Sequence, residues 1–288
     1  MHSILNNMLN HFRVFAGKEK KAEKALQWLR GSGVDVRAEL QQIKNTHVAS
    51  TKQTAKLKDL LGYAKPLFIS LGLMLFQQFS GINAVIFYGT HIFELAGSSL
   101  DPHVCTIIIG VANFGATFMA NLLIDRLGRK VLLLISDVFM IVSLGVLGGF
   151  FYLHANYKEQ VEGFGWAPLA SLIVYVIAFS LGFGPVPWLM LGEIFPGKIR
   201  GSAAAAATAF NWICCFTVTK VFPSFLQTFG ADVTFLCFAA ICLLGLAFIV
   251  LVVPETQGQS LDDIERHLTR PFRRLSSTAN LKPSPMFM

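Results

Sequence analysis

Three carboxamide side chains in the middle of an apolar run are the residues of this sequence with the most informative chemistry. Gln77, Gln78 and Asn83 lie within the run 66–93, which is long enough to cross a bilayer, since a spanning helix needs about 20 residues. Such groups are costly in hydrocarbon unless they face a partner or a wet cavity. Their paired donors and acceptors suit a hydroxyl-rich solute better than a metal or a bare ion. The Ser-Gly pair at 80–81 permits a break that brings Gln77 and Asn83 together, which predicts a sugar-binding segment in a membrane protein.

Three further side chains in apolar stretches are candidates for contact with the same ligand. Asn113 lies among valine and phenylalanine residues, and we expect it to contact the ligand. Asn211 fits a ligand contact and a hydrogen bond between helices equally well. Trp188 offers a ring that can stack on the apolar face of a sugar, although a kinked packing helix with a tryptophan at the membrane interface is the alternative.

The stretch around Trp188 carries signals for a broken helix. Pro185 and Pro187 lack the backbone donors that a helix needs, so carbonyls four residues earlier lose their partners. Gly182 and Gly184 add flexibility next to them. Broken helices at the middle of the membrane are typical of transporter binding sites and moving parts, so this stretch is a second candidate for the site.

Composition and charge place the chain among membrane proteins. Of its 288 residues 53% are hydrophobic and 14% are charged, with a net charge of +7. The charges gather at the ends, with 17 in residues 1–65, 15 in 66–253 and 9 in 254–288. Nucleic-acid binding requires basic and aromatic residues on one soluble surface, and here they are kept apart. The five cysteines lie in apolar segments without metal-site spacing, so we expect no metal and no cofactor.

Six apolar runs predict an all-α membrane domain between two polar flanks. Residues 1–65 read as a cytosolic segment with short amphipathic helices, 66–253 as the bundle, and 254–288 as a cytosolic tail. The basic residues gather in the second and fourth connections, which places both termini in the cytosol by the positive-inside rule. The six spans are expected at 66–93, 103–124, 131–154, 166–191, 202–226 and 232–253.

Charged residues next to the spans suggest an ion-pair latch. Asp125 and Arg129 belong to the tight basic turn between the second and third spans. Glu193 lies at the inner end of the fourth span, and Arg200 follows it. Together they could hold the cytosolic ends closed in one state, while a topology signal alone is the simpler interpretation of the turn.

One acidic residue lies inside a predicted span. We expect Asp137 to be hydrogen-bonded in a contact between helices, with a proton relay as the alternative. No span carries a nucleophile beside a base or a paired set of carboxylates, so the chain is not expected to be an enzyme.

Several ordered motifs resemble those of one transporter family. QQFSGINAVIFY, DRLGRK, GFGPVPW with LGEIFP, FNW and PETQG follow one another over about 17–266. In this order and spacing they resemble the sugar porter family of the major facilitator superfamily, especially facilitative glucose and insect trehalose transporters. The resemblance implies twelve spans in two halves with the substrate between them, of which this chain is similar to the second half.

The same resemblance implies roles for particular residues. Sugar binding falls on Gln77, Gln78, Asn83, Asn113 and Trp188, and the inner salt bridges on Asp125, Arg129, Glu193 and Arg200. Two departures, Ser180 for a glutamate and Cys215 for an asparagine, leave room for a sugar other than glucose.

The expected function is facilitative transport of a hexose or trehalose by alternating access. The location implied is the plasma membrane, with an intracellular membrane possible. Proton-coupled symport and a non-transporting half-protein that senses sugar are the alternatives. A single half gives the path one wall, so we expect either a preceding six-span half or another chain.

Overall fold

The computed structural model describes residues 62–97, 100–157 and 162–259, together with six isolated positions. The predicted amphipathic helices of the segment 1–65 and most of the tail 254–288 lie outside the described residues, so their structure stays a prediction. Every regular element in the described part is helical, which confirms the predicted all-α fold. The isolated positions are Glu23, Gln27, Val36, Gln41, Leu60 and Ile264.

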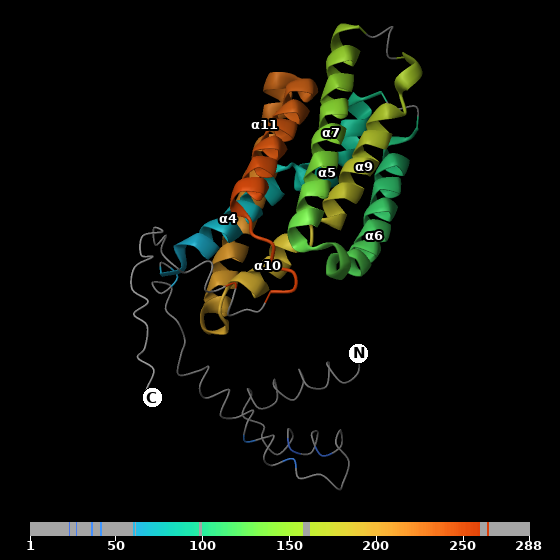
Figure 1. The fold of residues 1–288 in the computed structure, drawn as a ribbon. Coiled ribbons are helices and arrows are strands. Elements are labelled where there is room, and N and C mark those ends of the chain that lie inside the picture. Colours follow the sequence, from blue (N-terminus) through green and yellow to red (C-terminus); the bar gives the residue numbers. More distant parts are fainter. Residues whose placement is uncertain are drawn as a thin grey trace, which may run out of the picture.

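The helices form a bundle in which α6, α7, α9 and α11 run along a common direction (Figure 1). Two of the predicted spans are split into two helices each, the first into α4 and α5 and the fourth into α9 and α10. The elements are α4 (Ala64–Phe79), α5 (Ile82–Leu95), α6 (Pro102–Leu127), α7 (Arg129–Asn156), the short 3-10 helix η2 (Glu162–Phe164), α9 (Ala167–Leu181), α10 (Val186–Ile194) and α11 (Gly197–Val252).

The element α11 contains a sharp kink at Gly230, where the chain turns back on itself. This residue has φ 87° and ψ 166°, values that do not belong to a helix. The rings of Phe222 and Phe238 stack with centroids 6.1 Å apart, whereas a straight helix would separate residues at this spacing by about 24 Å. Two antiparallel arms, 197–229 and 231–252, therefore stand where the sequence predicts the fifth and sixth spans.

Within the described residues, five helical segments are long and apolar enough to cross a membrane. They are α4 with α5, α6, α7, α9 with α10, and α11 with its two arms. Large apolar side chains such as Phe114 and Trp212 are exposed on their outer faces. This surface suits lipid or another apolar partner and not water. Six separate crossings, one for each arm of α11, stay a prediction.

The hydrophobic core draws buried side chains from all of these α-helices. Tyr175, Phe93, Phe183 and Phe235 are among the largest side chains that are fully buried there. The packing is close where α7 meets the second arm of α11, because a Cβ at Gly148 would lie 2.8 Å from the Leu236 side chain.

Candidate substrate site and charged clasp

The first break, between α4 and α5, is held by hydrogen bonds to Ser80. Gly81 has φ 91°, a left-handed conformation that favours glycine. The Ser80 hydroxyl donates to the carbonyl of Gln77 at 2.8 Å. The hydroxyl of Tyr175, which is buried in α9, donates to the Ser80 carbonyl at 3.0 Å. The break is thus a fixed feature of the fold, and Tyr175 ties it to the neighbouring helix.

The second break, between α9 and α10, supplies free carbonyls to the first. In a regular helix the N–H of residue 187 would donate to the carbonyl of Phe183, but Pro187 has no N–H. The carboxamide nitrogen Nε2 of Gln77 donates to the carbonyl of Phe183 at 2.7 Å and to that of Gly184 at 3.0 Å. The proline therefore creates the acceptor with which Gln77 joins the two broken helices.

Four carboxamides form one hydrogen-bonded network. Asn211, from the first arm of α11, donates through Nδ2 to Gln77 Oε1 at 2.8 Å and accepts through Oδ1 from Gln78 Nε2 at 3.0 Å. Asn83, beyond the first break, donates to Gln78 Oε1. Gln77, Gln78 and Asn211 are 3, 6 and 3% exposed, whereas Asn83 is half-buried. Two predicted residues of the first span, Gln77 and Gln78, thus bond Asn211 from the fifth, and Asn83 joins them through Gln78.

The remaining candidates form a second polar contact and an exposed ring. The Ser180 hydroxyl donates to Asn113 Oδ1 at 2.7 Å and lies 2.8 Å from the Val176 carbonyl. Ser180 is buried and Asn113 is half-buried. Trp188, in α10, is 41% exposed. Ser180 therefore ties α9 to α6 through its hydrogen bond to Asn113.

Gly182 allows the second break to lie against α7. A Cβ at Gly182 would lie 2.5 Å from the carbonyl oxygen of Leu132 and from the Cβ of Ser136. The backbone N–H of Phe183 donates to the Ser136 hydroxyl at 3.3 Å. Only glycine permits this approach, so Gly182 positions the carbonyl of Phe183 that Gln77 uses.

The network has the properties of a site for a polyhydroxylated ligand. Carboxamides can exchange hydrogen bonds among themselves for bonds to hydroxyls, because each supplies both donors and acceptors. No group of three or more His, Cys, Asp or Glu residues in the described ranges is placed to hold a metal. Such a site can bind and release a neutral solute.

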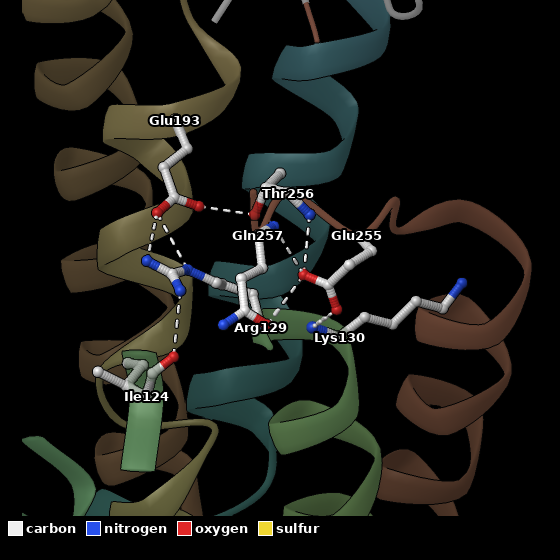
Figure 2. Close-up of polar contacts among 7 residues, drawn as sticks. All are labelled: Ile124, Arg129, Lys130, Glu193, Glu255, Thr256 and Gln257. Carbon is white, nitrogen blue, oxygen red and sulfur yellow. Dashed lines mark hydrogen bonds and ion pairs between the residues drawn. The ribbon is translucent and has the colours of Figure 1, made fainter. Parts of the chain in front are cut away.

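A charged clasp lies at the end of the bundle where α7 begins and α10 ends. Arg129 donates from Nε and from its terminal NH2 group to Glu193 Oε1, each at 3.0 Å (Figure 2). Its other terminal nitrogen donates to the carbonyl of Ile124 at 3.1 Å. The hydroxyl of Thr256 donates to Glu193 Oε2 at 2.6 Å. The clasp thus joins α6, α7, α10 and the segment after α11.

Glu255 caps the beginning of α7, which has no side-chain cap of its own. Its carboxylate accepts from the backbone N–H groups of Arg129 and Lys130, each at 3.0 Å (Figure 2). These are among the N–H groups that a helix leaves without partners at its start. Burial works to raise the pKa of Glu255, but hydrogen bonds from the backbone of Gln257, Arg129, Lys130 and Thr256 outweigh it, so the pKa is lowered.

The predicted latch and the observed clasp share only part of their members. Arg129 and Glu193 form the predicted ion pair. Arg200 donates to the carbonyl of Phe195 at 3.2 and 3.3 Å, where α10 ends. The side chain of Asp125 lies outside the described residues, so its part in the latch stays a prediction.

Comparison with known proteins places the chain in a family. A family model described as Sugar (and other) transporter matches residues 10–268. The chain belongs to this sugar transporter family. The match confirms the resemblance drawn from the sequence motifs. Together with the apolar helices, membership in the sugar transporter family makes the chain a multi-pass membrane protein.

Relatives and solved structures within the sugar transporter family are longer than this chain. A facilitated trehalose transporter of Aedes aegypti is 57% identical over 274 residues, which cover 94% of this chain and 34% of that protein. The corresponding protein of Polypedilum vanderplanki is 55% identical, with 94% and 54% covered. A structure of the proton:xylose symporter XylE bound to 6-bromo-6-deoxy-D-glucose is 32% identical with a TM-score of 0.66, covering 90% of this chain and 54% of that one. The chain therefore spans about a third to a half of these proteins.

The sequence prediction for Asp137 was wrong. Both of its carboxylate oxygens are buried without a hydrogen-bond partner among the described residues, whereas a helix-to-helix hydrogen bond was expected. Helix spacing predicts which face a residue occupies, but it cannot show whether the facing helix offers a donor.

Sequence reasoning also missed Glu255 and Tyr175. The PETQG motif that contains Glu255 was the available signal, since it places acceptors just after the last span. For Tyr175 no sequence signal was present, because its partner Ser80 is 95 positions away.

Proposed function

We propose that this chain forms one half of a transporter that moves a sugar across the membrane by alternating access. The observation that carries the proposal is the carboxamide network, because it joins Gln77, Gln78, Asn83 and Asn211 across two helix breaks. Neutral hydrogen-bonding groups beside broken helices can bind a sugar in one state and release it in another. Asn113 and Trp188 extend the site, the first by a hydrogen bond and the second by stacking on the ring.

The substrate class is a hexose or trehalose. The relatives at 54–57% identity are named trehalose transporters, which favours a disaccharide here. Ser180 and Cys215 also favour a larger ligand, because both are smaller than the residues that glucose transporters commonly carry there. Transport is passive in this proposal and involves no enzymatic step.

A transport path requires a second wall. The described chain exposes large aromatic residues on α6 and on the first arm of α11, among them Phe114, Trp212 and Phe216. Sugar transporters of this family bind substrate between two halves. We infer that an N-terminal six-span half, or another chain, packs against this one to close the path.

The orientation follows from charge, and the location from the family. Arg126, Arg129, Lys130, Lys198 and Arg200 lie at the clasp end of the bundle, so we assign this end to the cytosol. Both termini then lie in the cytosol, and the plasma membrane is the proposed location. The clasp would hold the cytosolic ends of the helices together in one state of the cycle.

The test is sugar exchange by a Gln78→Ala variant of the full-length protein at matched surface expression. Loss of one ligand hydrogen bond is worth about 1 kcal/mol, so we expect exchange to fall by about fivefold or more at low sugar concentration. Asn156→Ala is the matched control, because it removes an exposed carboxamide that bonds only its own helix, at Tyr152. Unchanged exchange in Gln78→Ala would remove the site assignment.

Proton-coupled symport is the second candidate function. The observation that favours it is the buried carboxyl group of Asp137 in α7, since symport needs a residue that can gain and lose a proton. Accumulation of sugar against its gradient when a pH gradient is imposed would support symport. Uptake that ignores both pH and uncouplers would exclude it.

A further inference from the structure

Asp137 is the one acidic residue in the described spans whose carboxyl group lies in the helix core. Its side chain is 1% exposed, and neither oxygen has a hydrogen-bond partner in the described part of the chain. It stands eight residues after Arg129 on α7, which is about 12 Å from the clasp end along the helix axis. Neither the clasp nor the carboxamide network uses it.

The groups that face Asp137 come from three other helices, and none of them is a cation. The second arm of α11 contributes Cys242 and Gly245, at which a Cβ would lie 3.4 Å from Asp137 Oδ2. The ring of Phe76, from α4, borders the same space. From α9, Tyr175 lies close enough for its hydroxyl to interact electrostatically with the carboxyl.

The basic residues nearest along α7 are engaged elsewhere. Arg129 is paired with Glu193, and Lys130 donates through Nζ to the carbonyl of Val250 at 3.0 Å. On α7 itself, the hydroxyl of Ser136 lies 3.6 Å from the sulfur of Met140 and accepts from the backbone of Phe183. In this conformation an ionised Asp137 would have no counter-ion among these groups, and no donor in the described part of the chain reaches its oxygens.

Burying such a carboxylate costs several kcal/mol, whereas the protonated acid costs far less. We propose that Asp137 is a proton-binding site, which holds a proton in this conformation and releases it when α7, α9 and the second arm of α11 move apart. Water that enters between the helices would then solvate the carboxylate. The link to a transport cycle rests on the proposed function, but the bound proton does not.

Tyr175 connects this proton to the first helix break. Its hydroxyl donates to the Ser80 carbonyl at 3.0 Å and lies 3.3 Å from the Ser80 hydroxyl oxygen. A movement of α9 away from α7, which would release the proton, would therefore also act on the contact that holds α4 and α5 at their break, next to Gln77 and Gln78.

Infrared spectroscopy of the native full-length protein in detergent at neutral pH tests the bound proton directly. We expect the C=O stretch of a protonated carboxylic acid in the wild type and its loss in Asp137→Asn. Glu94→Gln is the control, because it removes an exposed acid beside His91 that lies outside the helix core. Identical carboxylic-acid bands in wild type and Asp137→Asn would overturn the proposal.

Isotope labelling keeps the test independent of the variant's folding. In wild-type protein grown with ¹³C-labelled aspartate, the same band must shift, and an unshifted band overturns the proposal. A second readout is thermal unfolding against pH. The folded protein holds one proton that unfolded Asp137 loses above its ordinary range near pH 4.

The stability of the wild type should therefore fall relative to Asp137→Asn as pH rises from 5 to 8, by up to about tenfold in the folding equilibrium for each pH unit. Parallel pH profiles of the two proteins would overturn the proposal. Neither readout involves sugar. A protein that shows the band but carries no sugar would contradict the proposed function and support the proton site.

Discussion

Asn211 shows how much of the candidate site was visible in single residues. Its position in an apolar run fitted a ligand contact and a contact between helices equally well, and the structure shows bonds to Gln77 and Gln78. A carboxamide surrounded by apolar residues must find polar partners, so the sequence alone predicts that such residues meet. It cannot predict which atoms pair, since this depends on the exact position of two helix breaks.

Glu255 is a residue whose function depended on tertiary structure. Its partners Arg129 and Lys130 lie more than a hundred positions earlier, where α7 begins without its own cap. Nothing in the local pattern of the tail indicates such a distant partner. The sequence shows the acidic residue, but it does not show which helix this residue caps.

Replacing Glu255 by glutamine should destabilise the protein at neutral pH and change its response to acid. The pKa of Glu255 is lowered on folding, so its stabilising effect is present at neutral pH and is lost as pH falls through and below the ordinary range near 4. We expect a melting temperature lower than wild type by a few degrees at pH 7, with the difference shrinking towards pH 3. Thermal unfolding between pH 3 and 8 measures this. A constant difference at every pH would contradict the assigned charge.

At the scale of elements, the two helix breaks could be predicted from the sequence because each has its own local chemistry. Gly81 and Gly230 adopt positive φ angles, and the prolines at 185 and 187 remove donors. These signals are local, so they can be read without knowing the fold. The pairing of one break with the other by Gln77 is not local, and the structure was needed to find it.

Restoring a backbone donor in the second break should weaken transport. In Pro187→Ala the new N–H can donate to the Phe183 carbonyl and compete with Gln77 for it. We expect slower sugar exchange with unchanged or higher thermal stability, measured on the same purified protein. Pro102→Ala is the control, because proline at the first position of α6 removes no helical hydrogen bond. Exchange that is equally fast in both variants would show that the competition has no effect.

A methyl group at Gly182 should separate the second break from α7. A Cβ there would lie 2.5 Å from the Leu132 carbonyl oxygen, which cannot move without its helix. We expect Gly182→Ala to destabilise the protein by about 1–3 kcal/mol, the usual cost of overpacking. Gly192→Ala in α10 is the matched control, since a Cβ at Gly192 meets nothing within 4 Å. Equal melting temperatures of the two variants would argue against the close approach.

At the scale of the whole molecule, the distribution of charge and apolar surface predicted a membrane bundle. The flanks 1–65 and 254–288 hold most of the charges, and the described helices expose large apolar side chains. Composition reports such averages reliably because the bilayer imposes them on every span. Composition does not show whether lipid or a second protein half contacts the exposed aromatic residues of α6 and α11.

Sugar flux through this chain should require a second six-span half of the transporter. The remainder of the Polypedilum vanderplanki relative, expressed as a separate chain, is a suitable partner, since this chain aligns with 54% of that protein. We expect sugar flux in vesicles that contain both chains and background flux in vesicles with either alone. Flux by this chain alone would contradict the proposed two-walled path. Equal amounts of each chain in the membrane are the control for expression.

The cap that Glu255 places on α7 also sets an order of events during synthesis. The first turn of α7 is synthesised 126 residues before its cap. At about 5–20 residues per second, this turn waits for roughly 10 s with its amides unsatisfied by the carboxylate. A nascent chain that stops before Glu255 never receives the cap. The start of α7 is therefore capped only after translation has passed the last span. An incomplete product keeps an uncapped helix end that proteases can recognise.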